Sequence, residues 1–101
     1  MYIDFIEYKL ASGISEEQFI QESEVILESW MKHQKGFISW EIHRMSDGKY
    51  IDRVCWKDQQ SAKDAEVSMQ KDLPADSTWY ACYDFSSIVA KNGEQVFSFA
   101  Q

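Results

Sequence analysis

Two side chains suited to proton transfer, His43 and Asp52, lie on either side of the dipeptide Asp47-Gly48. Residues of apolar and polar type alternate before and after it, and Asp-Gly is a frequent two-residue loop between antiparallel strands. If Asp47 and Gly48 form that loop, His43 stands directly opposite Asp52. A carboxylate beside an imidazole can orient the ring, so the pair predicts an acid/base couple. The alternative is a structural or solvated cross-strand pair.

The same register brings three more side chains to the face that carries the predicted couple. Trp56 can stack against a flat substrate, and Tyr50 and Glu41 would face the same ligand. We therefore predict His43 and Asp52 as catalytic residues and the other three as substrate-binding residues. The alternative for Trp56 is a core position under a helix, and Tyr50 and Glu41 each have a structural alternative.

The opposite face of the predicted hairpin is mostly apolar. It would carry Ile38, Trp40 and Ile42 from the first strand and Ile51 from the second. A patch of this kind is too large and apolar for the surface of a monomer in water. We predict that these four residues form a dimer interface.

A strand and a helix must precede this hairpin. Residues 2–10 are rich in β-branched and aromatic types and predict a strand. Ser15 is a suitable N-cap, because Glu16 and Glu17 follow it in a first turn where the helix dipole favours acids. Apolar residues then recur at helical spacing, and Gly36 is predicted to close the helix.

A second helix follows the hairpin. Asp58 or Ser61 is predicted to cap it, and it runs to about Lys71. Four residues spaced to share one side form its buried stripe: Ala62, Ala65, Met69 and Leu73. Pro74, the only proline of the chain, is predicted to end this helix or to open another.

The remaining chain predicts a short helical turn over residues 76–83 and a last strand over 86–99, interrupted around Asn92-Gly93. The order of elements is then βαββαβ. Right-handed connections place such a chain in an α+β, ferredoxin-like fold with a four-stranded antiparallel sheet and its helices on one face. We predict one domain over residues 1–101, which pairs sheet to sheet with a second copy.

Charge and composition bear on the class of partner. Lys and Arg number 10 against 17 Asp and Glu, so an acidic chain of formal charge −7 predicts no nucleic acid and no membrane as partner. The sequence shows no membrane-spanning apolar run and no signal pattern, which predicts a cytoplasmic protein. Cys55 and Cys82 are then expected to be reduced, buried thiols, and their spacing predicts no metal site. We expect no cofactor.

Several short motifs, taken in order, resemble those of the antibiotic-biosynthesis-monooxygenase-like family of dimeric α+β barrel proteins. The resemblance covers most of the chain, and its small uncharacterised members are the most similar. It rests on a strand before a Gly-containing turn and on the following segments: Gly36-Phe37, Asp47-Gly48-Lys49-Tyr50 leading to Trp56, the helix with Ala62, and Tyr83-Asp84-Phe85-Ser86-Ser87-Ile88. The resemblance implies a homodimer packed sheet to sheet, with a pocket between sheet and helices in each subunit.

The resemblance also bears on site residues. The cofactor-free oxygenases of this family have an Asn and a Trp four residues apart on the third strand, and these positions match Asp52 and Trp56. Their Tyr on the following helix matches Ala62. The Asn, Trp and His of the haem-degrading branch fall near Ile6, Ala65 and Ala75, so haem degradation is not predicted.

Two functions are therefore expected for the predicted dimer. In the first, it is a cofactor-independent monooxygenase that acts on a small aromatic or quinone-like molecule. In the second, it is a non-catalytic dimer of the same fold that binds a small molecule or is associated with stress. The substrate is not identified by these residues.

Overall fold

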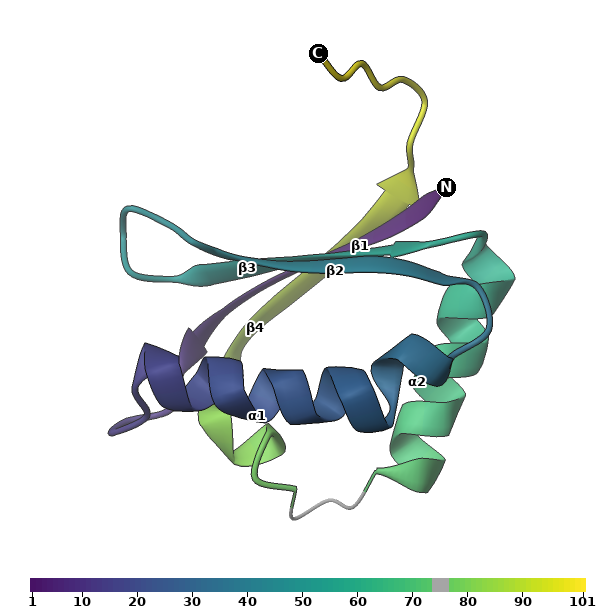
Figure 1. Cartoon of the computed structure of the whole chain (residues 1–101). Coiled ribbons are helices and arrows are strands. Elements are labelled where there is room, and N and C mark those ends of the chain that lie inside the picture. The colour runs from purple at the N-terminus through teal and green to yellow at the C-terminus, as the bar shows by residue number, and fades with distance from the viewer. Residues whose placement is uncertain (74–76) are drawn as a thin grey trace.

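Four antiparallel strands form one sheet, and two α-helices cover one of its faces (Figure 1). The computed structural model describes residues 1–73 and 77–101. The strand order is β2-β3-β1-β4, which confirms the predicted ferredoxin-like α+β fold. The elements along the chain are β1 (Tyr2–Leu10), α1 (Glu16–Ser29), the 3-10 helix η1 (Met31–His33), β2 (Phe37–Arg44), β3 (Tyr50–Trp56), α2 (Gln59–Asp72), the 3-10 helix η2 (Tyr80–Cys82) and β4 (Tyr83–Glu94).

Helix α1 begins as the sequence predicts and ends earlier. The Ser15 side chain accepts a hydrogen bond from the Gln18 amide at 3.1 Å, which caps the helix. The α-helix stops at Ser29, because the chain tightens into η1 before it reaches Gly36. Gly36 has φ +83°, so it makes the left-handed turn into β2 and does not close α1 directly.

Helix α2 is capped by Asp58, one of the two residues predicted for this role. Its carboxylate accepts from the Ser61 amide at 2.8 Å and from the Ser61 hydroxyl at 2.7 Å. The predicted stripe faces inward: Ala65 is buried, and Ala62, Met69 and Leu73 pack against the core. Pro74 lies outside the described residues.

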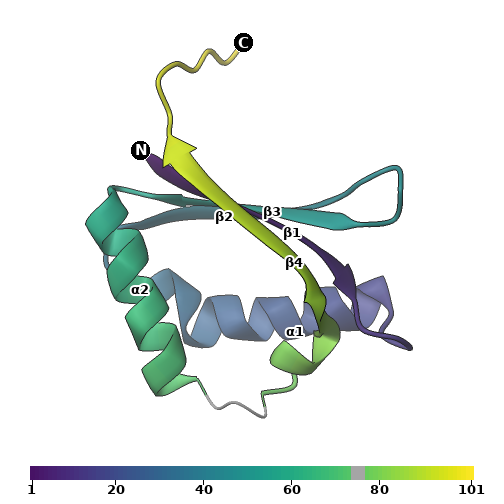
Figure 2. The same ribbon diagram turned by 180° about the vertical axis from the view of Figure 1, so that it is seen from behind.

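Aromatic rings form the core between the sheet and α1. Tyr8 and Phe19 are fully buried, and their rings pack edge to face with centroids 5.7 Å apart. Tyr50 and Tyr83 complete this aromatic cluster. Figures 1 and 2 show α1 lying along the sheet and α2 standing steeply away from it.

The loop between β2 and β3 has three residues, where the sequence predicts two. The Met45 carbonyl accepts from the Gly48 amide at 3.0 Å, and the Met45 amide donates to the Lys49 carbonyl at 2.8 Å. Gly48 has φ +85°, whereas Asp47 is not in the left-handed region. A two-residue Asp-Gly loop would need both residues there, so the chain forms a three-residue loop in which glycine alone adopts that conformation.

This loop shifts the register by one residue and exchanges the two faces of β2. Asp52 stands opposite Ile42, and His43 stands opposite Ile51, so the predicted pairing of His43 with Asp52 is wrong. Trp40 and Ile42 consequently lie on the helix-covered face with Asp52, and Glu41 and His43 lie on the outer face.

The last strand starts and ends earlier than predicted. β4 runs from Tyr83 to Glu94, and Asn92 and Gly93 are paired with β1 inside it. Its pairing with β1 is irregular between Asp84 and Val89, where the register shifts. Beyond it the Gln95 amide donates to the Met1 carbonyl at 2.9 Å, and the chain then leaves the sheet as an extended tail. Phe97 and Phe99 in this tail are both at least 80% exposed.

Both cysteines, Cys55 and Cys82, are unpaired and buried. Within residues 1–73 and 77–101, no group of three or more His, Cys, Asp or Glu side chains is arranged to hold a metal ion. In the same part of the chain no helix has the length and apolar character needed to cross a membrane.

Candidate functional site

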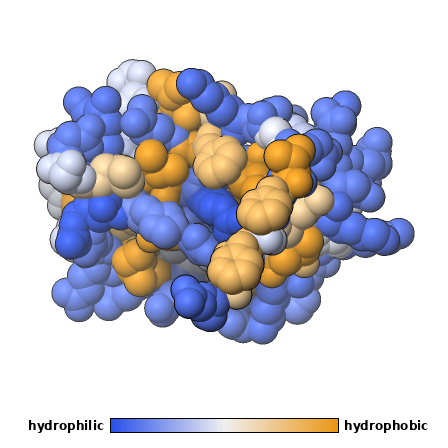
Figure 3. All heavy atoms as spheres, turned by 90° about the horizontal axis from the view of Figure 1, so that it is seen from above, coloured by the Kyte–Doolittle hydropathy of each residue, from blue (hydrophilic) through white to orange (hydrophobic). Residues whose placement is uncertain are grey.

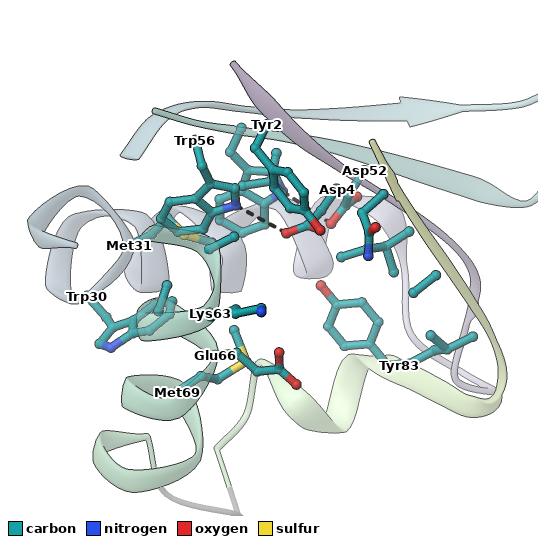
Figure 4. A pocket seen from close by; sticks show the side chains of 18 of the residues that line it. Tyr2, Asp4, Trp30, Met31, Asp52, Trp56, Lys63, Glu66, Met69 and Tyr83 are labelled. Atoms are coloured by element: carbon teal, nitrogen blue, oxygen red, sulfur yellow. Dashed lines mark hydrogen bonds between the residues drawn. The ribbon is translucent and has the colours of Figure 1, made fainter. Parts of the chain in front are cut away.

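A cavity of about 590 Å³ lies between α2 and the helix-covered face of the sheet (Figure 4). Its walls come from all four strands, from α2, η1 and η2, and from Trp30 directly after α1. All four tryptophans of the chain line it: Trp30, Trp40, Trp56 and Trp79. A mainly apolar concave site with a few polar groups is the usual form of a small-molecule pocket.

Asp52 is the most buried acid in this cavity. It lies in the middle of β3 with 3% of its surface exposed. Tyr8 on β1 donates its hydroxyl to Oδ1 at 2.5 Å, and Trp40 on β2 donates its indole N–H to Oδ2 at 3.1 Å. Both donors stand diagonally across from Asp52, so the two neighbouring strands hold its carboxylate from either side.

Burial changes the charge state of Asp52. It raises the pKa of this carboxyl from 3.8 to about 6, because the apolar surroundings disfavour the ionised form. The bonds from Tyr8 and Trp40 and the positive charge of His43 act in the opposite direction and do not offset burial. A carboxylate with a pKa near neutrality can take and return a proton under ordinary conditions.

Asp4 on β1 also accepts a hydrogen bond from an indole N–H of a neighbouring strand. The Trp56 indole N–H donates to Asp4 Oδ2 at 3.2 Å, and Asp4 stands opposite Val54, two residues before Trp56. Desolvation raises the pKa of Asp4, although the bond from Trp56 lowers it. Two indole rings are thus fixed by two carboxylates, and both pairs border the cavity.

Other polar groups lie around the two acids. Figure 4 shows the Tyr83 hydroxyl pointing into the space toward which Asp4 and Asp52 also turn. Burial raises the pKa of Tyr83, so its phenol stays protonated at neutral pH. Lys63 and Glu66 approach from α2, and both are exposed at the rim.

The structure brings together two of the five predicted site residues. Asp52 and Trp56 both border the large cavity. Tyr50 instead donates its hydroxyl to Glu16 at 3.0 Å and, with His43, borders a second cavity of about 370 Å³ at the β2 edge. His43 and Glu41 lie on the outer face and bond to each other at 2.9 Å, so the predicted single site is divided between locations.

The four predicted interface residues are likewise divided. Ile51 lies on the outer face, and Ile38 is 51% exposed at a bulge in β2. Trp40 lines the cavity and Ile42 packs against the core, so these two residues are turned away from the outer face.

The sequence-based prediction omitted Asp4, Trp30, Trp79 and Tyr83 from the site. A signal for Asp4 existed, because Tyr2, Asp4, Ile6 and Tyr8 share one face of a strand and only Asp4 is charged. The remaining three become neighbours only through the packing of η2 and of the end of α1.

Several solved structures have the same fold. ActVA-Orf6, a monooxygenase of Streptomyces coelicolor solved with nanaomycin D, matches with a TM-score of 0.75 and 10% identity over 99% of this chain and 91% of its own. SnoaB, a cofactor-independent oxygenase of Streptomyces nogalater, matches with a TM-score of 0.72 and 14% identity over 99% and 98%. MhuD, a haem degrader of Mycobacterium tuberculosis with two haems in its active site, matches with a TM-score of 0.74 and 11% identity over 99% and 100%.

No protein-family profile matches the sequence, and no curated protein matches it. The likeness to the solved structures covers nearly the whole chain at low identity, so it concerns the fold. The fold predicted from the resemblance is confirmed: this chain has the ferredoxin-like subunit fold of the antibiotic-biosynthesis-monooxygenase-like proteins.

Proposed function

We propose that the protein is a homodimer whose cavity binds a small aromatic molecule and oxidises it with O₂, without flavin or metal, using Asp52 as the general base. The observation that carries the proposal is the position of Asp52. It is a buried carboxylate with a pKa of about 6 in a cavity lined by aromatic side chains. Perturbed acids in such cavities are candidates for proton transfer.

The proposed reaction begins with a phenol or hydroquinone between Asp52 and Trp56. Asp52 takes the hydroxyl proton, and the resulting phenolate passes one electron to O₂. The two radicals combine to a peroxide, which takes up a proton and loses water to leave a quinone. For a simple phenol, one molecule of substrate and one of O₂ give one quinone and one water. Protonated Asp52 no longer repels the phenolate and can donate a hydrogen bond to it.

A non-catalytic binding protein is the second candidate, and the hydrogen bonds of Asp52 favour it. Both carboxylate oxygens already accept from Tyr8 and Trp40, so a substrate hydroxyl must compete with these donors. The family positions that carry Asn and Tyr in the cofactor-free oxygenases hold Asp52 and Ala62 here. The same cavity then serves for binding alone.

The homodimer is proposed from the outer face of the sheet, which Figure 3 views from the side away from the helices. Apolar side chains gather there among hydrophilic ones, and Phe5, Ile38 and Val89 are each at least 42% exposed. The chain exposes 6884 Å². A compact monomer of this mass exposes about 5,900 Å². Part of the excess is the extended tail after Glu94, in which Val96, Phe97 and Phe99 are at least 80% exposed, and the apolar side chains of the outer face add to it.

Oxygen uptake with 1-naphthol tests the catalytic step, and quenching of tryptophan fluorescence tests binding, because all four tryptophans line the cavity. We expect 1-naphthol to quench the fluorescence and to be oxidised. Asp52→Ala removes the proposed base without supplying the Asn of the cofactor-free oxygenases, and it should retain the quenching and lose the oxygen uptake. Binding without uptake in the unsubstituted protein would favour the non-catalytic candidate. The absence of both would contradict the proposed function.

A further inference from the structure

We infer that the cavity selects an aromatic cation: a flat ring system that carries a fixed positive charge. This inference rests on the proposed function, since it assigns a ligand class to the same cavity. It follows from two features of the walls, the charge of the ionisable groups and the number of aromatic rings.

The ionisable groups of the cavity leave a negative charge at its inner wall. Lys63 and Glu66 stand three residues apart on α2, both at the rim, and their charges offset each other. Asp4 and Asp52 remain, and in the described residues neither forms a salt bridge with a Lys, Arg or His side chain. Their hydrogen-bond donors are neutral indole and phenol groups. Burial of carboxylates without a cationic partner is unfavourable, and a bound cation would relieve it.

The aromatic walls suit the same ligand. A cation is attracted to the face of an aromatic ring, most strongly to that of tryptophan. The N–H edges of Trp40 and Trp56 are bound to the carboxylates of Asp52 and Asp4, so two of the four indole rings are held in place before a ligand enters. A ligand of this class would therefore meet ordered rings and fixed negative charges in one cavity.

Other ligand classes fit these walls less well. An anionic ring compound would be repelled by the two acids, and the whole chain has a formal charge of −7 that adds to the repulsion. A neutral ring compound would gain from the apolar walls and leave the buried carboxylates unpaired. The charge of the ligand is therefore the property to test, with the shape held constant.

Three bicyclic probes of similar shape separate these classes: N-methylquinolinium, 1-methylnaphthalene and 1-naphthoate. Their affinities for the full chain are measured by calorimetry at pH 8, where Asp52 is ionised. The hydrophobic effect alone predicts that the neutral probe binds most tightly. We expect N-methylquinolinium to bind about tenfold or more tightly than 1-methylnaphthalene, and 1-naphthoate to bind most weakly.

Substitutions that each remove one negative charge test which carboxylates cause the preference for the cation. Asp52→Asn and Asp4→Asn each keep an oxygen that can accept from the neighbouring indole and should each reduce the preference for the cation over its neutral isostere. Asp64→Asn is the matched control, because Asp64 is an acid of α2 that does not line the cavity. It should leave the preference unchanged. Asp4 is half-buried, so its variant remains informative if Asp52→Asn fails to fold.

Each result has a distinct meaning. Tighter binding of 1-methylnaphthalene or 1-naphthoate than of the cation would overturn this inference and leave the proposed aromatic site standing. If Asp64→Asn reduced the preference for the cation as much as Asp52→Asn and Asp4→Asn do, the preference would come from the net charge of the whole chain. That result would also overturn the inference. No binding of any probe at millimolar concentration would contradict the proposed function itself.

Discussion

Asp52 owes its raised pKa to burial, and burial links its protonation to the stability of the fold. Its pKa is about 6 in the folded protein against an ordinary value of 3.8. The folded state thus binds the proton more tightly than the unfolded state between these values, and the free energy of unfolding should fall as pH rises through this window. The full difference is about 3 kcal/mol, and roughly 2 kcal/mol of it is lost between pH 4 and pH 7.

The first prediction isolates this contribution by comparing the protein with its Asp52→Asn variant in urea at a series of pH values. Other acids contribute equally to both and cancel. We expect the original protein to lose roughly 2 kcal/mol of stability relative to the variant as pH is raised from 4 to 7. A difference that does not depend on pH would show that Asp52 titrates normally.

The hydroxyl of Tyr8 also affects the pKa of the Asp52 carboxyl. It donates to Asp52 at 2.5 Å and lowers the carboxyl pKa, so burial acts against it. Tyr8→Phe should therefore move the titration of Asp52 to higher pH, as followed by the carbon resonance of its carboxyl group. Tyr50→Phe is the control, because the Tyr50 hydroxyl bonds to Glu16. An equal shift in both variants would exclude a direct effect of Tyr8.

At the scale of elements, the hairpin shows why part of the site was predictable and part was not. The alternation of residues in β2 and β3 and the glycine of the loop are visible in the sequence, and both strands form as predicted. The register depends on whether one or two loop residues adopt the left-handed conformation. That difference of one residue moves His43 from the face of Asp52 to the opposite face.

The cavity depends on packing that local patterns do not encode. Asp52 and Trp56 were predictable as neighbours on one face, since they lie two and six positions along the same strand from Tyr50. Trp30 reaches the cavity from the end of α1, where its indole N–H donates to Ser68 of α2 at 3.0 Å, and Trp79 reaches it from the turn before η2. These relations between distant elements are tertiary, so the sequence predicted the fold class better than it predicted the walls of the site.

Gly36 links three of the elements that enclose the cavity. A Cβ atom at this position would lie 2.2 Å from the Ser61 hydroxyl oxygen and 2.5 Å from its Cβ, at the first turn of α2. The residue also has φ +83°. We expect Gly36→Ala to lower the free energy of unfolding by more than about 2 kcal/mol, since the strain of the left-handed conformation adds to this overlap.

Gly48→Ala is the matched control for this third prediction. Gly48 has a similar φ of +85°, and a Cβ there would meet no atom within 4 Å. Its substitution should lower the free energy of unfolding by about 1 kcal/mol, from backbone strain alone. Urea unfolding measures both variants. Equal losses would show that the contact between Gly36 and α2 does not constrain the fold.

At the scale of the whole molecule, the two faces of the sheet differ in what covers them. The helices and the cavity cover one face, and the other has exposed apolar side chains with an extended C-terminal tail that contains Phe97 and Phe99. The predicted interface included Trp40 and Ile42, which the register turns inward. The proposed dimer therefore keeps Ile38 and Ile51 and uses Phe5 and Val89 of the outer face in place of Trp40 and Ile42.

The fourth prediction places a charge at the centre of that outer face. Phe5 lies between Arg53 on β3 and Lys91 on β4, so Phe5→Glu introduces an acid between two basic residues and should leave the subunit folded. In a sheet-to-sheet dimer the same acid would be buried against an apolar partner surface, which is unfavourable. We expect sedimentation at micromolar concentration to show a dimer for the original protein and a folded monomer for this variant.

Val25→Glu makes the same chemical change at an exposed apolar position of α1 and should remain dimeric. A monomeric original protein, or a Phe5→Glu variant that still dimerises, would contradict an interface on this face.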